Sequence, residues 1–177
     1  MINSTVLSEI ENKLNNQQLL SFQAAKTEIK NNKITTGFYW IYTNFPITKF
    51  LSIPTPRNNT AHIDLGYLSS IHQNLRCVIK QGSNSEWWCI YNGKDKNLNN
   101  RIQNHFSGTY SATSSNGNLA LIEFFTKQEL LMNFRVKYIA CNAPNNAKGI
   151  VTAYGCLEKD LERVWRLNNG WSIFCCL

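Results

Sequence analysis

The segment EWWCIYNGKDKNLNNRIQNHF, residues 86–106, constrains the fold more than any other because its pattern changes twice within a few residues. Residues 86–91 are mostly apolar and aromatic, which is typical of a strand. Gly93 and Lys94 then predict a turn, and residues 95–106 predict a helix. The core-facing positions of this helix recur every fourth residue: Leu98, Ile102 and Phe106. A strand, a turn and a helix in direct succession favour a fold in which helices pack on a sheet.

Other parts of the chain also have clear patterns. Helices are expected over residues 6–24, 119–134 and 153–167, and further strands over residues 34–42, 75–80 and 135–141. The sequence NNK at residues 31–33 ends the first helical region. This order predicts the α+β class, with a small central, mostly antiparallel β-sheet flanked by helices. We expect one domain over residues 1–177, with residues 1–33 as an N-terminal helical arm.

Composition narrows the class of protein. The chain has 177 residues, 43% of them hydrophobic, which is enough apolar material for one core. Its net charge of +7 favours a polyanionic partner such as nucleic acid, although many soluble proteins are basic without a functional reason. No apolar run approaches the roughly 20 residues of a membrane span, and no secretory leader is recognisable. The six cysteines include no CxxC pair, so we expect free thiols, no zinc site and a cytoplasmic protein.

A second line of residues on the 95–106 helix is polar and lies beside the core-facing one. Arg101 and His105 are four positions apart, so they share a face and are expected at the border between buried and exposed surface. Glu158 follows the core position Leu157 and has the same border place on the C-terminal helix. The cationic and the acidic borders are predicted to meet across a cleft.

These residues also have purely structural interpretations. Tyr39 and Tyr91 can be strand aromatics that pack in the core. Arg101 and His105 can belong to a solvated helix face. Glu158 can simply pair with Lys159 or Arg163, or set the charge of its helix together with Glu162.

Taken together, the residues resemble the GIY-YIG nuclease family. GFY at residues 37–39 corresponds to the first motif and YNG at residues 91–93 to the second, with Asn92 where the family has an aliphatic residue. The family then has a basic residue, an arginine ten residues after the second tyrosine and a histidine one helical turn later. The matching positions here are Lys94, Arg101 and His105. The resemblance implies a metal-dependent DNA endonuclease.

The resemblance also implies a metal site. Glu158 matches the family's metal-binding glutamate, with Glu162 one turn later as a rival ligand, and Asn169 lies near an expected asparagine. The implied ion is Mg²⁺, with Mn²⁺ as a substitute. A single carboxylate binds Mg²⁺ weakly, so waters and a phosphate oxygen of the DNA should complete its octahedral shell.

The other matched residues imply roles in phosphodiester hydrolysis. Arg101 would contact the scissile phosphate, and Tyr39 is the candidate general base. A phenol has a pKa of about 10, so nearby cations such as Lys94, Arg101 or the metal must lower the pKa of Tyr39 for this role. His105 would take or pass the proton, and Tyr91 would orient water or phosphate.

The matched parts leave little room for a separate DNA-binding domain. Recognition is therefore expected in residues 43–86, an insertion between the two motif strands, where Arg57 could contact guanine and Asn58 or Asn59 adenine. The alternative is that these asparagines reflect the asparagine-rich composition of the whole chain. Such an arrangement resembles the type II restriction endonucleases of the family, which implies double-stranded DNA as substrate and a homodimer for cutting both strands.

Two alternatives remain open at this point. One is a nuclease of the same family without a restriction role, for example a mobile-element, repair or toxin nuclease. The other belongs to a different class, a catalytically silent DNA-binding module.

Overall fold

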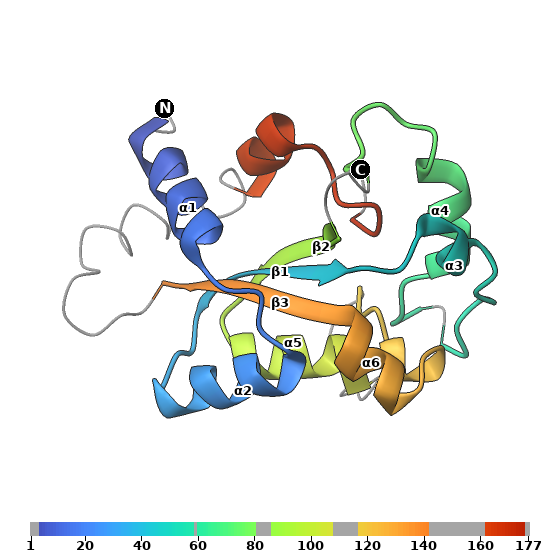
Figure 1. The fold of residues 1–177 in the computed structure, drawn as a ribbon, viewed down its shortest axis with the longest axis horizontal. Coiled ribbons are helices and arrows are strands. Elements are labelled where there is room, and N and C mark those ends of the chain that lie inside the picture. The colour runs from blue at the N-terminus through green and yellow to red at the C-terminus, as the bar shows by residue number, and fades with distance from the viewer. Residues whose placement is uncertain (1–3, 59, 81–85, 108–116, 142–161, 176–177) are drawn as a thin grey trace.

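The protein is an α+β structure built on a three-stranded antiparallel sheet (Figure 1). The computed structural model describes residues 4–58, 60–80, 86–107, 117–141 and 162–175. In the sheet, β1 (Gly37–Thr43) lies between β2 (Trp88–Asp95) and β3 (Phe134–Ala140). The helices are α1 (Ser4–Asn16), α2 (Phe22–Asn31), α3 (Ile47–Leu51), α4 (Leu65–His72), α5 (Leu98–Ser107), the 3₁₀ turn η1 (Leu121–Glu123) and α6 (Lys127–Asn133). Residues 162–169 form a further helix, called the C-terminal helix below.

Both faces of the sheet are buried, and β1 shows why. Its residues alternate between the faces, as the two-residue period of a strand requires. Tyr39 and Ile41 belong to the larger core with α2 and α5, whereas Phe38 and Trp40 pack with α1 and the C-terminal helix. Each such buried side chain contributes about 1.5–3 kcal/mol to stability relative to leaving it exposed. The two helical layers seen above and below the sheet in Figure 1 are therefore both parts of the core.

The strand that carries the second motif is longer than expected. β2 does not end at Tyr91 but continues to Asp95, so the predicted turn at Gly93 and Lys94 was wrong. Both residues pair with the central strand, Gly93 opposite Tyr39 and Lys94 opposite Phe38. The backbone hydrogen bonds of this ladder outweigh the turn preference of glycine, since tertiary pairing routinely overrides local propensity.

The N-terminal region contains two helices instead of the single helix predicted over residues 6–24. α1 ends at Asn16, and Leu20 then forms an isolated bridge with Val136 of β3, with N···O distances of 3.0 and 2.8 Å. Ser21 caps the start of α2 by accepting a hydrogen bond from the Ala24 amide, 3.2 Å away. The periodic pattern missed this break because a capping serine also fits the polar face of a continuous helix. The predicted end of the region at residues 31–33 is confirmed.

Two other predictions were wrong in part. Residues 75–80 do not form a strand and contribute only an isolated bridge to Trp171. Residues 119–134 are not one helix, because a 3₁₀ turn precedes α6 and the chain restarts at a capping box formed by Thr126 and Glu129. The strand predicted over residues 135–141 is confirmed as β3.

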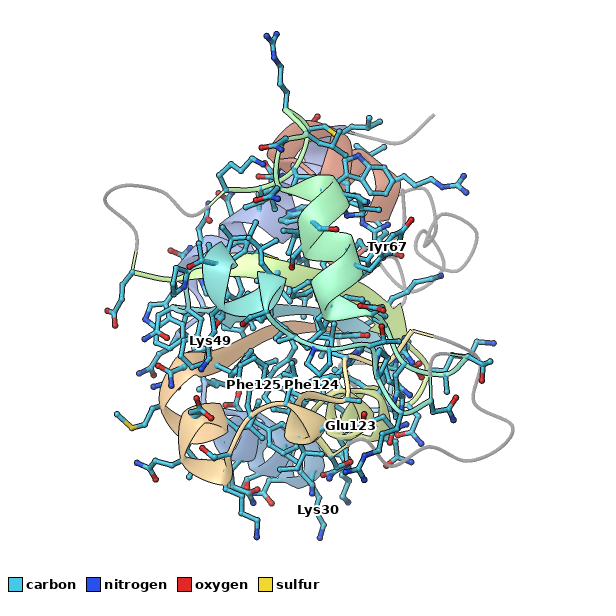
Figure 2. The ribbon with its side chains drawn as sticks, turned by 90° about the vertical axis from the view of Figure 1, so that its right-hand side faces the viewer. Lys30, Lys49, Tyr67, Glu123, Phe124 and Phe125 are labelled. Atoms are coloured by element: carbon cyan, nitrogen blue, oxygen red, sulfur yellow. The ribbon has the colours of Figure 1, made fainter. Side chains whose placement is uncertain are left out.

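The insertion between β1 and β2 has structure of its own. α3 and α4 lie side by side at one end of the sheet, where Tyr67 projects outward from α4 (Figure 2). Phe50 of α3 is fully buried and packs edge-on against Trp88 and Phe174. The insertion is thus anchored in the main core. None of the helices in the described part of the chain is long and apolar enough to cross a membrane.

Candidate active site

The first and second motifs meet α5 at a buried cluster of polar side chains. Tyr39 is fully buried, and its hydroxyl lies 2.7 Å from His105 Nε2. Arg101 Nε donates a hydrogen bond to the same hydroxyl at 3.2 Å, and Arg101 Nη2 donates a longer one to the Tyr91 hydroxyl at 3.4 Å. Four residues predicted from separate parts of the sequence therefore lie in direct contact.

The hydrogen bonds of His105 determine its tautomer. The Leu119 backbone N–H donates to Nδ1 at 3.1 Å, so Nδ1 carries the lone pair and the proton of the neutral ring lies on Nε2. His105 therefore donates to Tyr39. Burial lowers the pKa of His105 well below its ordinary value, and the charge of Arg101 lowers it further. The expectation that His105 lies at the border between buried and exposed surface was wrong, since the ring is fully buried. Its part in taking or passing a proton stays a prediction.

The guanidinium of Arg101 is held by neutral oxygens. Nη1 donates to Asn118 Oδ1 at 2.8 Å and Nη2 to the Gly117 carbonyl at 3.1 Å. The nearest carboxylate in the described part of the chain is Asp95, whose Oδ2 lies 3.9 Å from Nε. These contacts fix the side chain without neutralising it closely, so its charge remains available to an anion. The contacts that residues 117–119 make with Arg101 and His105 were not predicted, because the composition of this region is typical of a loop.

Gly93 makes room for Tyr39. A Cβ atom at this position would lie 2.7 Å from the Tyr39 hydroxyl oxygen and 3.0 Å from Cζ, closer than real Cβ contacts. The glycine of the second motif is thus required by the close approach of the first motif's phenol across the strand pair. No turn conformation is involved.

Burial dominates the ionisation of Tyr39. It raises the pKa of Tyr39 well above 10, and the neighbouring Tyr91 raises it further, while Arg101 lowers it. Arg101 therefore acts in the expected direction, but burial outweighs it in the protein by itself. The two N–H donors on the phenol oxygen nevertheless favour the phenolate, because hydrogen bonds to the charged form stabilise it.

The cluster opens into a hollow of about 410 Å³. Its lining residues come from β1, β2, α5 and the C-terminal helix: Tyr39, Tyr91, Gly93, Lys94, Arg101, Glu162, Arg163 and Arg166. Four of them are cationic and one is acidic. The positive excess suits a phosphate group. Arg163 and Arg166 were missed by sequence reasoning, although Arg166 lies one helical turn after Glu162 and that spacing could have signalled it.

The predicted metal ligand Glu158 lies outside the described residues. Glu162 does line the hollow, and its Oε1 accepts a hydrogen bond from Arg166. Burial raises the pKa of Glu162, and Arg166 and Lys94 oppose this effect. Its second oxygen has no hydrogen-bond partner among the described residues. A carboxylate oxygen in a hollow wide enough for water fits Mg²⁺, which retains most of its water shell in proteins. Within the described residues no group of three metal-ligating side chains occurs.

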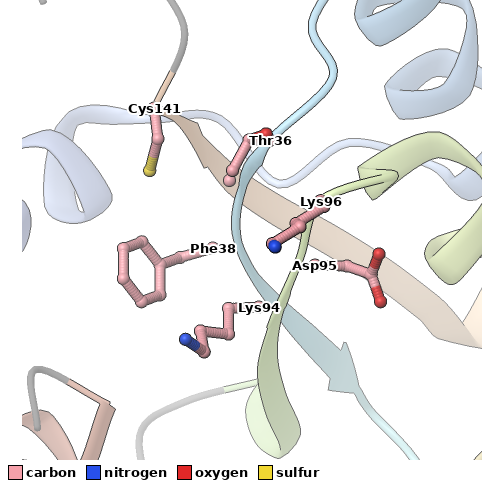
Figure 3. A pocket seen from close by; sticks show the side chains of 7 residues that line it. Thr36, Phe38, Lys94, Asp95, Lys96 and Cys141 are labelled. Carbon is pink, nitrogen blue, oxygen red and sulfur yellow. The ribbon is translucent and has the colours of Figure 1, made fainter. Parts of the chain in front are cut away.

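A second hollow of about 320 Å³ lies at the start of β1 (Figure 3). Lys94 borders this hollow as well as the first one. Figure 3 shows Lys94 and Lys96 on one side of β2 and the Asp95 carboxylate on the other. Asp95 Oδ1 accepts a hydrogen bond from the Asn97 backbone at 2.7 Å, before the start of α5. The positive side of β2 therefore continues beyond the first hollow.

The predicted recognition residues lie apart from this site. Arg57 is exposed, and Asn58 Oδ1 accepts hydrogen bonds from Thr60 Oγ1 at 2.8 Å and the Ala61 amide at 3.2 Å. Asn59 is outside the described residues. Asn169 donates to Glu11 Oε1 at 3.0 Å and borders a different hollow. The structure thus brings together the residues of the two motifs and α5, and it does not bring Arg57, Asn58 or Asn169 to them.

Searches against models of protein families, curated proteins and solved structures find no match to this chain.

Proposed function

We propose that the protein is a divalent-metal-dependent DNA endonuclease of the GIY-YIG type. One observation supports this proposal best. Arg101 and His105 both contact the phenol oxygen of Tyr39, beside a positively charged hollow. These residues match the family pattern in the sequence although they lie up to 66 positions apart in the chain. A solvated helix face, the bland alternative for Arg101 and His105, does not account for a fully buried histidine.

The proposed chemistry assigns each described residue one task. The scissile phosphate binds in the hollow, where Arg101 and Lys94 stabilise the negative charge that develops on its oxygens. Tyr39 accepts the proton of the attacking water as a phenolate, which His105 Nε2–H and Arg101 Nε–H stabilise. Tyr91 orients the phosphate or the water through its hydroxyl. A bound Mg²⁺, or Mn²⁺ in its place, would supply a further positive charge at the phosphate and to the water.

Because burial raises the pKa of Tyr39, the base requires this added charge. The proposal therefore couples metal and base: a divalent cation in the hollow lowers the pKa of the phenol. Cleavage is expected to depend on the metal even when DNA binding does not.

Within this class, we propose a type II restriction endonuclease that cuts a short double-stranded sequence as a homodimer. The insertion carries α3 and α4 at one end of the sheet, where a recognition surface has room to form. One site per subunit requires two subunits to cut both strands of a symmetric sequence.

The test is incubation of the purified protein with Mg²⁺ and several plasmid and phage DNAs. Discrete fragments that map to one short sequence are expected. Smearing or structure-specific nicking would favour a nuclease without a restriction role. Binding without cleavage in both Mg²⁺ and Mn²⁺ would contradict the proposed activity and favour the catalytically silent DNA-binding module.

A second experiment identifies the metal ligand. Glu158→Ala and Glu162→Gln are compared for the Mg²⁺ concentration that gives half-maximal cleavage and for DNA binding without metal. The family resemblance predicts that Glu158→Ala abolishes cleavage and that Glu162→Gln retains it. The reverse result would assign the metal to the carboxylate that lines the hollow.

A further inference from the structure

The hollow contains a second anchored arginine that the family pattern does not include. Arg166 enters from the C-terminal helix, opposite Arg101 of α5, and its side chain is 12% exposed. It is held more firmly than a surface cation. Nε donates to Asn92 Oδ1 at 3.1 Å, Nη2 donates to the Asn92 carbonyl at 3.2 Å, and the guanidinium lies 4.9 Å from the ring of Trp171.

The residue that anchors Arg166 is the one that departs from the family pattern. Asn92 stands where an aliphatic residue is expected, and it is buried with 3% of its surface exposed. A buried amide is costly unless it is hydrogen-bonded, and Asn92 Oδ1 also accepts from Ser172 Oγ at 3.1 Å. An aliphatic side chain would leave only the backbone carbonyl of residue 92 to accept from the guanidinium. Asn92, which differs from the family pattern, and Arg166 are therefore joined in one hydrogen-bonded arrangement.

Arg166 has donors beyond those that bind other described residues. A guanidinium has five N–H groups, and the bonds above use those on Nε and Nη2. The two N–H groups of Nη1 have no partner among the described residues. Arg166 lines the hollow together with Arg101, so a phosphate there meets fixed cations on both sides. Fixed donors lose less entropy on binding than flexible ones.

We propose that Arg166 is a second phosphate-binding residue, which contacts the DNA backbone beside the scissile phosphate, and that Asn92 is its positioning residue. This inference rests on the proposed nuclease function. It concerns how the substrate is held and not which group takes the proton.

The matched control is Arg163. It lies on the same helix and lines the same hollow, but its side chain is exposed and no described residue forms a hydrogen bond with it. Arg163→Met and Arg166→Met remove the same charge, the first from an exposed side chain and the second from a hydrogen-bonded one. Arg166→Lys retains the charge and loses the double contact with Asn92.

The experiment measures the binding of each protein to a fluorescent duplex oligonucleotide without divalent metal, from 50 to 200 mM salt. Each lost phosphate contact lowers the slope of log Kd against log salt by about 0.9. The slope for Arg166→Met is expected to be lower by this amount. Raising the salt from 50 to 200 mM should therefore weaken DNA binding by a factor roughly threefold smaller in Arg166→Met than in the parent protein. Arg163→Met should lose clearly less, and Arg166→Lys should keep the slope.

Several outcomes would overturn the inference. Equal slopes for the parent protein and Arg166→Met would show that Arg166 does not contact a phosphate. Equal losses of slope in Arg166→Met and Arg166→Lys would show that the charge at this position does not contact a phosphate. If the parent protein neither binds nor cuts DNA, the proposed function itself fails, and this result differs from all the others.

Discussion

The two walls of the hollow are built in opposite ways. On the α5 wall, Tyr39 and His105 are fully buried and every polar atom of the cluster is fixed by another. On the wall formed by the C-terminal helix, charge is the main feature: Glu162, Arg163 and Arg166 project into the hollow with part of their surface exposed. From this contrast we expect the two walls to have different roles. In the proposed nuclease, the first wall would set the geometry of the reacting groups, and the second would supply charge for binding substrate and metal.

This division predicts that substitutions on the α5 wall change the reaction rate and the stability together. Substitutions on the C-terminal wall should change binding and its dependence on salt or metal, with little change in stability. Four experiments test the contrast.

The largest effect is expected for Tyr39→Phe. The change removes the proposed base, so single-turnover cleavage should fall by about 10²–10⁴-fold. It also leaves the donors of His105 and Arg101 without their acceptor, which costs about 1–3 kcal/mol in the free energy of unfolding. DNA affinity without metal, measured in parallel, should stay unchanged. Cleavage at the parental rate would remove Tyr39 from the mechanism.

Gly93→Ala should come next. The added Cβ meets the Tyr39 hydroxyl at 2.7 Å, and overpacking of this kind costs about 1–3 kcal/mol. Denaturant unfolding of Gly93→Ala, Tyr39→Phe and the double variant completes a double-mutant cycle. The cost of the alanine should be smaller beside phenylalanine, because the closest contact is gone. Additive costs would show that the two motif residues are not coupled.

His105→Gln tests the α5 wall through pH. Burial lowers the pKa of His105, so below pH 6.5 the unfolded state binds a proton that the folded state does not. The free energy of unfolding of the parent protein should therefore fall as pH decreases, by up to about 1.4 kcal/mol per pH unit from this group. Glutamine does not titrate, so the variant should show a shallower slope between pH 7 and pH 5. Identical slopes would mean that His105 titrates alike in both states.

The smallest effect on stability is expected for Glu162→Gln on the opposite wall. The carboxylate pairs with Arg166, but burial disfavours its charged form and raises the pKa of Glu162. These two effects oppose each other, so the free energy of unfolding should change less than in Tyr39→Phe. A loss as large as that of Tyr39→Phe would erase the distinction between the two walls.

The sequence predicted the α5 wall better than the rest. The β-branched and aromatic composition of residues 34–42 identified β1, and alternation over residues 135–141 identified β3. The four-residue period over residues 95–106 identified α5 and placed Arg101 and His105 beside its buried stripe. These patterns did not reveal that His105 is buried, because a neutral histidine with two partners has no distinct sequence pattern. Nor did they show that Gly93 lies within a strand, since its role depends on the phenol opposite.

The C-terminal wall depends on contacts between residues that are distant in the chain. Asn92 and Arg166 are 74 positions apart, and their hydrogen bonds follow from the packing of a helix on the sheet. The breaks after Asn16 and before Thr126 likewise depend on capping and on a bridge to a distant strand. Local patterns specify which residues are buried, but they do not specify which buried residues meet.

One feature of the sheet also matters for handling the protein. A sheet of three strands has two outer strands with unpaired backbone groups, which can recruit other chains and cause aggregation. Here Leu20 and the Gln17 side chain satisfy backbone groups of β3, while the Phe174 amide binds the Ile90 carbonyl of β2. Shortened versions that lack residues 17–20 or 172–175 would present open strands, and self-association would follow even with every residue around the hollow intact.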